Sequence, residues 1–220
     1  MSESMLTPAA SGSRWRAAGL WWKRPFDLVL GSIALLVALP LICCLGVAVT
    51  LEDGGPALFE QDRVGRRGRC FRMWKLRTMR PECEQDTHQR SAANWFAGTA
   101  VGDRYKTLAD PRVTRVGRLL RRFDLDELPQ LFNVVRGDMS LVGPRPAIPY
   151  ELAHYEPVYY RRLSVAPGMT GLWQVSDRDR LSAAEMMALD LRYVDHVSPW
   201  LDLRVMARTV PALVAAARRG

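Results

Sequence analysis

The sequence contains few of the residues that build metal clusters and disulfide frameworks. Its four cysteines show no CxxC spacing, and Cys43 and Cys44 lie inside an apolar run. Its three histidines are scattered along the chain, and nothing nearby marks any of them as a ligand or a base. We therefore expect no zinc site, no disulfide framework, and thiols that stay reduced.

Acidic residues are also in the minority, with 23 Asp and Glu against 31 Lys and Arg and a net charge of +8. This surplus suits a phosphate-rich partner such as nucleic acid, anionic lipid or a nucleotide, and its sign does not choose among them. A chain of 220 residues with 48% hydrophobic composition can form one sizeable domain with appendages. The first 14 residues lack apolar periodicity, so we expect a disordered or interfacial tail over residues 1–22.

Charged side chains are absent between Leu28 and Leu51. A helix needs about 20 predominantly apolar residues to cross a bilayer, so this stretch is long enough. It is too long for a secretory signal peptide, and no clean small-residue cleavage site follows it. The stretch therefore predicts a membrane-inserted helix.

Both flanks of this stretch are cationic. Arginines, a lysine and three tryptophans precede it, and eight cationic residues lie between Arg63 and Arg80. Because cationic flanks favour the cytoplasm, a single crossing would satisfy only one of them. Pro40 would split the stretch into two halves of about 18 Å, neither of which spans alone. A helix-break-helix that re-enters the same face and a spanning helix with a proline kink both stay open.

The segment from Ala57 to Met79 predicts a β-hairpin, because short apolar pieces flank a turn at Gly65 and Gly68. Residues 81–110 are polar and have few periodic apolar positions, which predicts a loop with at most one short helix. No internal repeat is visible.

Arginines and apolar residues share a predicted helix that begins near Arg115. Four apolar side chains recur at helical spacing, at Val116, Leu119, Leu120 and Phe123. Four arginines and no acidic residue occur from Arg115 to Arg122. We favour contact with phosphate or an anionic membrane surface over a merely solvated charged face.

The sequence DLDELPQLF, residues 124–132, places the adjacent carboxylates of Asp126 and Glu127 ahead of Pro129. Proline is tolerated in the first turn of a helix, so we expect a helix that begins near Asp126. Acidic residues at a helix start often only cap it. Here arginines precede the pair and the loops RGDMS and VGPRP follow it, so the pair could bind a divalent metal ion and attack phosphorus while Arg145 holds phosphate oxygens. Spacing alone leaves capping and catalysis open.

Two helices are predicted in the C-terminal third. Ser182 and Glu185 have the spacing of a capping box, and Asp190 lies in the helix that follows, where it is either solvated or functional. Ser198 and Pro199 have the order expected at the start of the second helix. That helix carries apolar residues and several arginines, so it either lies at a membrane interface or packs on the core.

Five segments occur in an order typical of one family: KRPFD (23–27), the proline-containing apolar segment, WKLRTM (74–79), LDELPQLFNVVRGDMSLVGPRP (125–146) and RRLSVAPGMTGLWQVSDR (161–178). With these segments the chain resembles the bacterial sugar transferases, the monotopic phosphoglycosyl transferases that begin exopolysaccharide and O-antigen assembly. The likeness runs from Lys23 to the C-terminus.

The resemblance implies a reaction and a site. Members move a sugar 1-phosphate from a nucleotide diphosphate sugar, here a UDP-hexose, to undecaprenyl phosphate with Mg²⁺, and they release UMP through a covalent phosphosugar on an aspartate. By match to the motif, Asp126 is the nucleophile, and Asp126 and Glu127 hold the metal. We expect Arg145 to grip the phosphoryl group in a bidentate contact. The further cationic candidates for substrate binding are Arg121, Lys75, Arg77 and Arg178.

The resemblance also implies the architecture. We expect an α-rich α+β protein with a re-entrant membrane helix over residues 23–52 and a cytoplasmic catalytic domain over residues 53–220, which contains a short β-hairpin and interfacial amphipathic helices. The protein would lie on the cytoplasmic face of the bacterial inner membrane. The membrane re-entry motif comprises Lys23, Arg24, Asp27 and Pro40.

Three positions depart from the usual family pattern. Leu39 replaces a serine before Pro40, which removes a hydroxyl able to bond the backbone one turn earlier. Asp124 stands where relatives often have serine, and SDRD (176–179) stands where many have Gly-Arg-Asn. The Leu39 departure leaves the break to Pro40 and other parts of the protein, and the other two departures bear on sugar preference more than on reaction type.

The expected partners are a nucleotide sugar, undecaprenyl phosphate and membrane lipid, without nucleic acid. The family contains dimers, so a homodimer stays among the expected states. The competing hypothesis is a non-catalytic, membrane-anchored basic protein that binds anionic lipid or nucleic acid.

Overall fold

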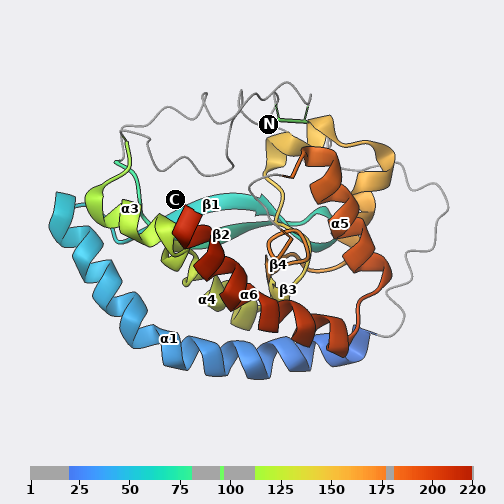
Figure 1. Cartoon of the computed structure of the whole chain (residues 1–220), viewed down its shortest axis with the longest axis horizontal. Coiled ribbons are helices and arrows are strands. Elements are labelled where there is room, and N and C mark those ends of the chain that lie inside the picture. Colours follow the sequence, from blue (N-terminus) through green and yellow to red (C-terminus); the bar gives the residue numbers. More distant parts are fainter. Residues whose placement is uncertain (1–19, 81–94, 97–111, 177–180, 220) are drawn as a thin grey trace.

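The computed structural model of the chain describes residues 20–80, 95–96, 112–176 and 181–219. Helices predominate, and the strands form two separate pairs (Figure 1). The helices and strands in chain order are α1 (Lys23–Asp53), β1 (Leu58–Val64), β2 (Cys70–Leu76), α3 (Arg115–Arg122), α4 (Gln130–Arg136), β3 (Ser140–Val142), β4 (Gly168–Thr170), α5 (Ala183–Asp195) and α6 (Pro199–Arg219). The expectation of an α-rich protein with a small sheet is confirmed, whereas the loop predicted over residues 81–110 lies mostly outside the described residues.

β1 and β2 form the predicted hairpin and pair antiparallel along their whole length. At their turn Gly68 has a φ of 76°, a conformation that glycine adopts without steric cost. Val64 at the end of β1 donates its main-chain N–H to the carbonyl oxygen of Ala147. This bond holds the hairpin against the segment that contains Arg145.

β3 and β4 form a parallel pair that the sequence patterns did not predict. Each strand has three residues, which is too short for apolar alternation to reveal. The two backbones lie so close that a Cβ at Gly168 would be 2.0 Å from the main-chain nitrogen of Gly143. Glycine at position 168 therefore allows the VGPRP loop to lie beside the segment that begins at Arg161.

α1 is one continuous helix, which corrects the helix-break-helix expected from Pro40. Pro40 lies inside it, and Figure 1 shows that the helix bends part-way along while its ribbon stays helical. A proline removes one hydrogen bond and displaces the carbonyl group one turn earlier, which kinks a long helix whose other bonds continue. Within the described part of the chain, this helix alone is long and apolar enough to cross a membrane.

α1 packs one face on the protein and turns an apolar face outward. Gly31 approaches α4 so closely that a Cβ there would lie 2.9 Å from a methyl carbon of Val134. The exposed apolar residues of the helix are Leu28, Val29, Ile33, Leu36, Val37, Leu39, Leu41, Val47 and Leu51. An exposed apolar surface of this kind is typical of contact with lipid or with another protein.

Both ends of α1 contact the same globular body. At the N-terminal end, Lys23 forms ion pairs with Asp27 and with Asp202 of α6. At the C-terminal end, the Glu52 carboxylate accepts hydrogen bonds from the main-chain N–H groups of Arg115 and Val116 in α3. The globular part lies on the concave side of the bent helix (Figure 1).

α3 turns only part of its predicted apolar stripe inward. Leu120 is buried in a cluster with Val49 of α1 and Leu76 of β2. Leu119 and Phe123 are exposed, on a helix that carries several arginines. Exposed apolar residues among arginines are typical of a helix at a membrane interface.

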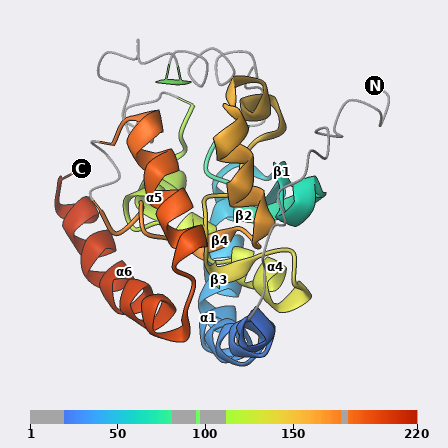
Figure 2. The ribbon, with the colours of Figure 1, turned by 90° about the vertical axis from the view of Figure 1, so that its right-hand side faces the viewer.

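α5 and α6 begin where the sequence predicted, after the Ser182–Glu185 capping box and at Pro199. α6 buries Asp202 and Val205 in the protein and exposes several apolar residues, among them Trp200, Leu203 and Val210. The helix therefore packs on the core with one face and presents an apolar face outward. Figure 2 shows α5 and α6 on one side of α1, with α4 and the hairpin on the other.

Candidate active site

The Asp126–Glu127 pair lies on a single 3-10 turn, Leu125–Glu127, between α3 and α4. α4 begins at Gln130, so the helix expected near Asp126 starts four residues later. Asp124 precedes the turn with a φ of 53°, and aspartate is among the residues that tolerate this left-handed conformation best. The turn buries Asp126, whose exposed fraction is 4%.

Glu127 lines a pocket on the protein. Its carboxylate forms an ion pair of 3.1 Å with Lys75 of β2, which also lines the pocket. The remaining lining residues are Arg63, Met73, Gln130, Arg145, Pro146, Gly168, Met169, Trp173 and Gln174. The hairpin, the turn after α3 and the VGPRP loop therefore bring Glu127 and three cationic side chains to one pocket.

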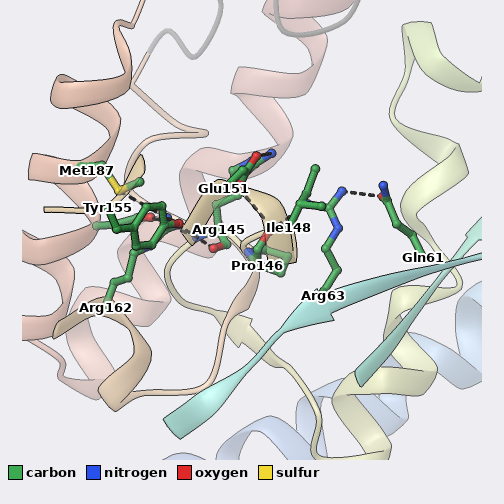
Figure 3. Close-up of polar contacts among 10 residues, drawn as sticks. Gln61, Arg63, Arg145, Pro146, Ile148, Glu151, Tyr155, Arg162 and Met187 are labelled. Carbon is green, nitrogen blue, oxygen red and sulfur yellow. Dashed lines mark hydrogen bonds and ion pairs between the residues drawn. The ribbon is translucent and has the colours of Figure 1, made fainter. Parts of the chain in front are cut away.

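Arg145 is held in this pocket by its side chain and by its main chain. Both terminal nitrogens of its guanidinium bind the Glu151 carboxylate, at 2.8 and 3.1 Å. Its main-chain N–H donates to Asp190, and its carbonyl oxygen accepts a hydrogen bond of 2.6 Å from Arg162. Figure 3 shows Arg145, Glu151 and Arg162 between the helical segments and the hairpin. The bidentate contact with a phosphoryl group stays a prediction, and in this structure both terminal nitrogens of Arg145 bind Glu151.

Asp190 is fully buried and forms an ion pair with Arg162, so the solvated alternative for Asp190 is wrong. Burial raises the pKa of the Asp190 carboxyl to about 6, against the lowering effect of the Arg162 guanidinium. The pKa of Glu151 shifts the other way. Its burial raises the pKa, but the Arg145 charge and hydrogen bonds, with help from Arg63, lower it below its usual value.

Three buried residues of this region were not singled out from the sequence as site residues. Arg63, at the end of β1, donates to the carbonyl oxygen of Pro146 and to the side chain of Gln61 (Figure 3). Arg162 lies inside a matched family segment, which was a usable signal. Glu151 follows Ile148 by three residues and accepts its main-chain N–H, but this local spacing does not reveal the contact with Arg145.

The other predicted cations lie elsewhere. Arg77 is buried and pairs with Asp53 at the C-terminal end of α1, away from the pocket lining. Arg121 lies in the last turn of α3 and is not among the lining residues. Arg178 falls outside the described residues. Lys75 and Arg145 are thus the two predicted substrate-binding cations that the structure brings together.

Comparison with known proteins identifies the family. Residues 18–216 match the bacterial sugar transferase family, which is nearly the whole chain. The chain belongs to the bacterial sugar transferase family. As a member of this family it is a transferase, which confirms the resemblance stated from the motifs.

Relatives of this sugar transferase carry informative names. It is 39% identical to the exopolysaccharide production protein ExoY of Rhizobium meliloti, over 90% of this chain and 88% of that protein. It is 41% identical to an undecaprenyl-phosphate galactose phosphotransferase of Salmonella typhimurium, over 87% of this chain and 40% of the relative. It is 40% identical to a UDP-glucose:undecaprenyl-phosphate glucose-1-phosphate transferase of Caulobacter vibrioides, over 97% of this chain and 77% of the relative. The chain thus spans less than half of the Salmonella protein and most of the other two.

Proposed function

We propose that this sugar transferase moves a sugar 1-phosphate from a UDP-hexose to undecaprenyl phosphate, giving undecaprenyl-diphosphate-sugar and UMP. An oxygen of the Asp126 carboxylate attacks the phosphorus that carries the sugar, the bond from that phosphorus to the bridging oxygen breaks, and UMP leaves with the bridging oxygen. A phosphate oxygen of undecaprenyl phosphate then attacks the same phosphorus, and the bond to Asp126 breaks to return the carboxylate. The product would begin an exopolysaccharide or O-antigen chain.

The observation that carries this proposal is a cationic pocket lined by Glu127, whose neighbour Asp126 is buried on the same turn. Lys75, Arg63 and Arg145 line that pocket, and fixed cations can stabilise the charge on a diphosphate as it reacts. A protein that only binds phosphate gains nothing from two carboxylates among its arginines. The pair therefore favours the enzyme over the non-catalytic alternative.

We propose Mg²⁺ as the cofactor. Among the described residues no group of three His, Cys, Asp or Glu could hold a metal ion unaided. Mg²⁺ commonly binds one or two carboxylates and completes its coordination with water and substrate phosphates, and the adjacent carboxylates of Asp126 and Glu127 fit that pattern. Bound there, Mg²⁺ would neutralise negative charge on the diphosphate.

The membrane placement proposed is re-entry of α1 from the cytoplasmic face of the bacterial inner membrane. α1 has 31 residues and is about 46 Å long at the usual rise per residue, against a hydrocarbon core of about 30 Å. A straight crossing would place its ends on opposite sides of the bilayer, yet Lys23 and Glu52 both contact the globular body. These contacts support a helix that enters one leaflet and keeps both ends on one side.

The nucleophile is tested with Asp126→Asn. Purified protein with Mg²⁺, UDP-glucose or UDP-galactose, and undecaprenyl phosphate should release UMP, and Asp126→Asn should abolish that release because a neutral amide does not attack phosphorus. Asp124→Asn, the same change two residues earlier, should keep activity. Labelled UMP should exchange into the UDP-sugar without acceptor if Asp126 carries the phosphosugar. Full activity of Asp126→Asn would contradict the assignment, and a wild type that binds lipid without releasing UMP would favour the non-catalytic alternative.

The donor sugar is tested with a panel of nucleotide sugars. The names of the relatives specify galactose in one case and glucose in another, and neither name decides for this chain. We expect UMP release from one of these two UDP-hexoses to exceed that from UDP-linked modified amino sugars. Preference for a modified amino sugar would contradict the hexose assignment and leave the reaction type intact.

The topology is tested with single cysteines at positions 20 and 60, in a variant whose four native cysteines are replaced by serine. Both cysteines should react with a membrane-impermeant thiol reagent only from the cytoplasmic side. Labelling from opposite sides would show a spanning helix.

A further inference from the structure

Glu151 is a buried carboxylate that pairs with Arg145, one of the cations of the pocket. It lies in a 3-10 helix, Pro149–His154, with an exposed fraction of 2%, and it is not itself among the pocket-lining residues. Its Oε2 accepts from Arg145 and from the main-chain N–H of Ile148, and its Oε1 accepts from the other terminal nitrogen of Arg145. These contacts fix the carboxylate against the guanidinium of Arg145, which lines the pocket.

Glu151 stays ionised at neutral pH despite its burial. The Arg145 charge and the hydrogen bonds to Glu151 outweigh the burial effect, and the more distant Arg63 charge adds to them, so the pKa of Glu151 lies below its usual range. The buried carboxylates of Glu151 and Asp190 both lie close enough to Arg145 to interact with its charge. Glu151 is the one that meets the guanidinium in a bidentate pair, and removing one charge from a buried pair is costly.

The geometry also restricts how Arg145 can move. A bidentate pair fixes the plane of a guanidinium group more firmly than a single hydrogen bond, and Arg162 and Asp190 hold the main chain of Arg145 on both sides. Arg145 thus presents its charge to the pocket from a fixed position. A fixed charge stabilises the charge that develops in a transition state, whereas a mobile one can relax onto the ground-state anion.

We propose that Glu151 is a positioning residue for the transfer reaction, which holds Arg145 and, through its charge, Arg63 in the arrangement that favours the transition state over the bound nucleotide. This inference rests on the proposed function, because it assigns these arginines to the diphosphate of the donor.

The test compares Glu151→Gln with wild type in steady-state turnover and in UMP binding by calorimetry. Glu151→Gln keeps the size of the side chain and removes its charge and one acceptor, so Arg145 loses its counter-charge and becomes less restrained. We expect kcat to fall by roughly 10–100-fold, the range typical of losing a partner that orients a metal ligand, while UMP binds several-fold more tightly. Simple loss of folded protein would lower kcat and leave the UMP dissociation constant of the folded fraction unchanged.

Glu151→Asp distinguishes the effect of the charge from the effect of the side-chain geometry. It also replaces Glu151→Gln as the test variant if Glu151→Gln does not fold. It keeps the charge and shortens the side chain, so kcat should fall without tighter UMP binding. The matched control is Asp195→Asn, which neutralises a carboxylate paired with Arg161 at the surface and should change neither quantity. An unchanged kcat in both Glu151 variants overturns the proposal. A raised kcat in Glu151→Gln also overturns it, since Arg145 would then have to leave Glu151 to react.

The two proposals fail differently. If the wild type binds UMP but turns over no UDP-hexose, the proposed function falls, and the positioning of the arginines is judged on UMP binding alone. Tighter binding by Glu151→Gln than by wild type and Asp195→Asn would then support the role of Glu151 in restraining the arginines, and equal binding would overturn it.

Discussion

The two ends of α1 are attached to the globular body by different physical means. At the N-terminal end, Lys23 lies between two buried carboxylates, Asp27 and Asp202, and Asp202 also accepts a hydrogen bond from the buried Tyr193. At the C-terminal end, the exposed Glu52 caps the first turn of α3. The first attachment is an ionic cluster removed from water. The second combines a solvent-exposed helix cap with the ion pair between Asp53 and the buried Arg77.

This difference implies that Lys23 and Glu52 carry unequal shares of the stability. Charges out of water interact strongly and are costly to leave unpaired, whereas a solvated carboxylate contributes little. We therefore expect the N-terminal end to fix α1 on the core, and the C-terminal end to orient α3 and the turn that carries Asp126.

The largest effect should follow from Lys23→Met. This change leaves Asp27 and Asp202 facing each other without their shared cation, so the free energy of unfolding should fall by about 3–5 kcal/mol, the usual cost of breaking a buried ion pair from one side. Thermal and denaturant unfolding in detergent would measure it. Adding Asp202→Asn to Lys23→Met should recover part of the loss, and a further loss would contradict the ionic account.

A second prediction is that the two ends respond to pH in opposite directions. Burial raises the pKa of Asp202, with the Asp27 charge adding to this, against Lys23 and Tyr193. A carboxyl group whose pKa is raised by folding stabilises the protein at pH values below its ordinary pKa of 3.8. This stabilisation is lost as the pH rises through the folded-state pKa. The stability of wild type relative to Asp202→Asn should therefore fall as pH rises from acidic to neutral.

Glu52 has the opposite shift. Slight burial raises its pKa, but hydrogen bonds from the main chain of Val116 and Arg115 lower it below 4.5. Glu52 therefore stabilises the protein at pH values above its ordinary pKa of 4.5. This stabilisation is lost as the pH falls through the folded-state pKa. The stability of wild type relative to Glu52→Gln should thus rise from acidic to neutral pH. Parallel pH profiles for the Asp202 and Glu52 comparisons would contradict the distinction between the ends.

The smallest effect should follow from Glu52→Gln at neutral pH. The amide keeps one acceptor oxygen and loses the favourable charge at the start of α3, so the loss should be at most about 1 kcal/mol for a solvated cap. Faster hydrogen exchange at the Arg115 and Val116 amides, with α4 amides as the internal control, would measure it. A loss as large as that of Lys23→Met would show that both ends anchor the helix equally.

Much of the secondary structure could be predicted because its signals are local. The hairpin turn at Gly68, the capping box at Ser182 and the proline at position 199 each act on neighbours within a few residues. Pro40 marks the limit of such reasoning, because a proline in a long helix is compatible with a break or a bend. Packing of Gly31 against Val134 holds the helix on the body, and the structure shows a bend.

Some residues of the candidate site could be predicted from local sequence signals, and others could not. Asp126, Glu127 and Lys75 were found through motifs, and the structure brings Glu127 and Lys75 within 3.1 Å. Arg63 and Glu151 were not found, because a lone arginine at a strand end and a lone glutamate near a proline have many solvated counterparts. Their significance depends on a common neighbour, Arg145, which no periodicity reveals.

The sequence alone determined where the apolar helix lies, where most helices and the hairpin begin, and which family motif carries the two carboxylates. The positions of the helices and the hairpin depend on hydrogen bonding and side-chain burial over a few adjacent residues, and the motif is a continuous stretch of sequence. Only the tertiary structure decided that Lys23 meets Asp202, 179 residues away, that the short strands β3 and β4 pair, and that Glu151 restrains Arg145. Such contacts arise because buried charges must find partners wherever the packed chain brings them, and the sequence does not state those distances.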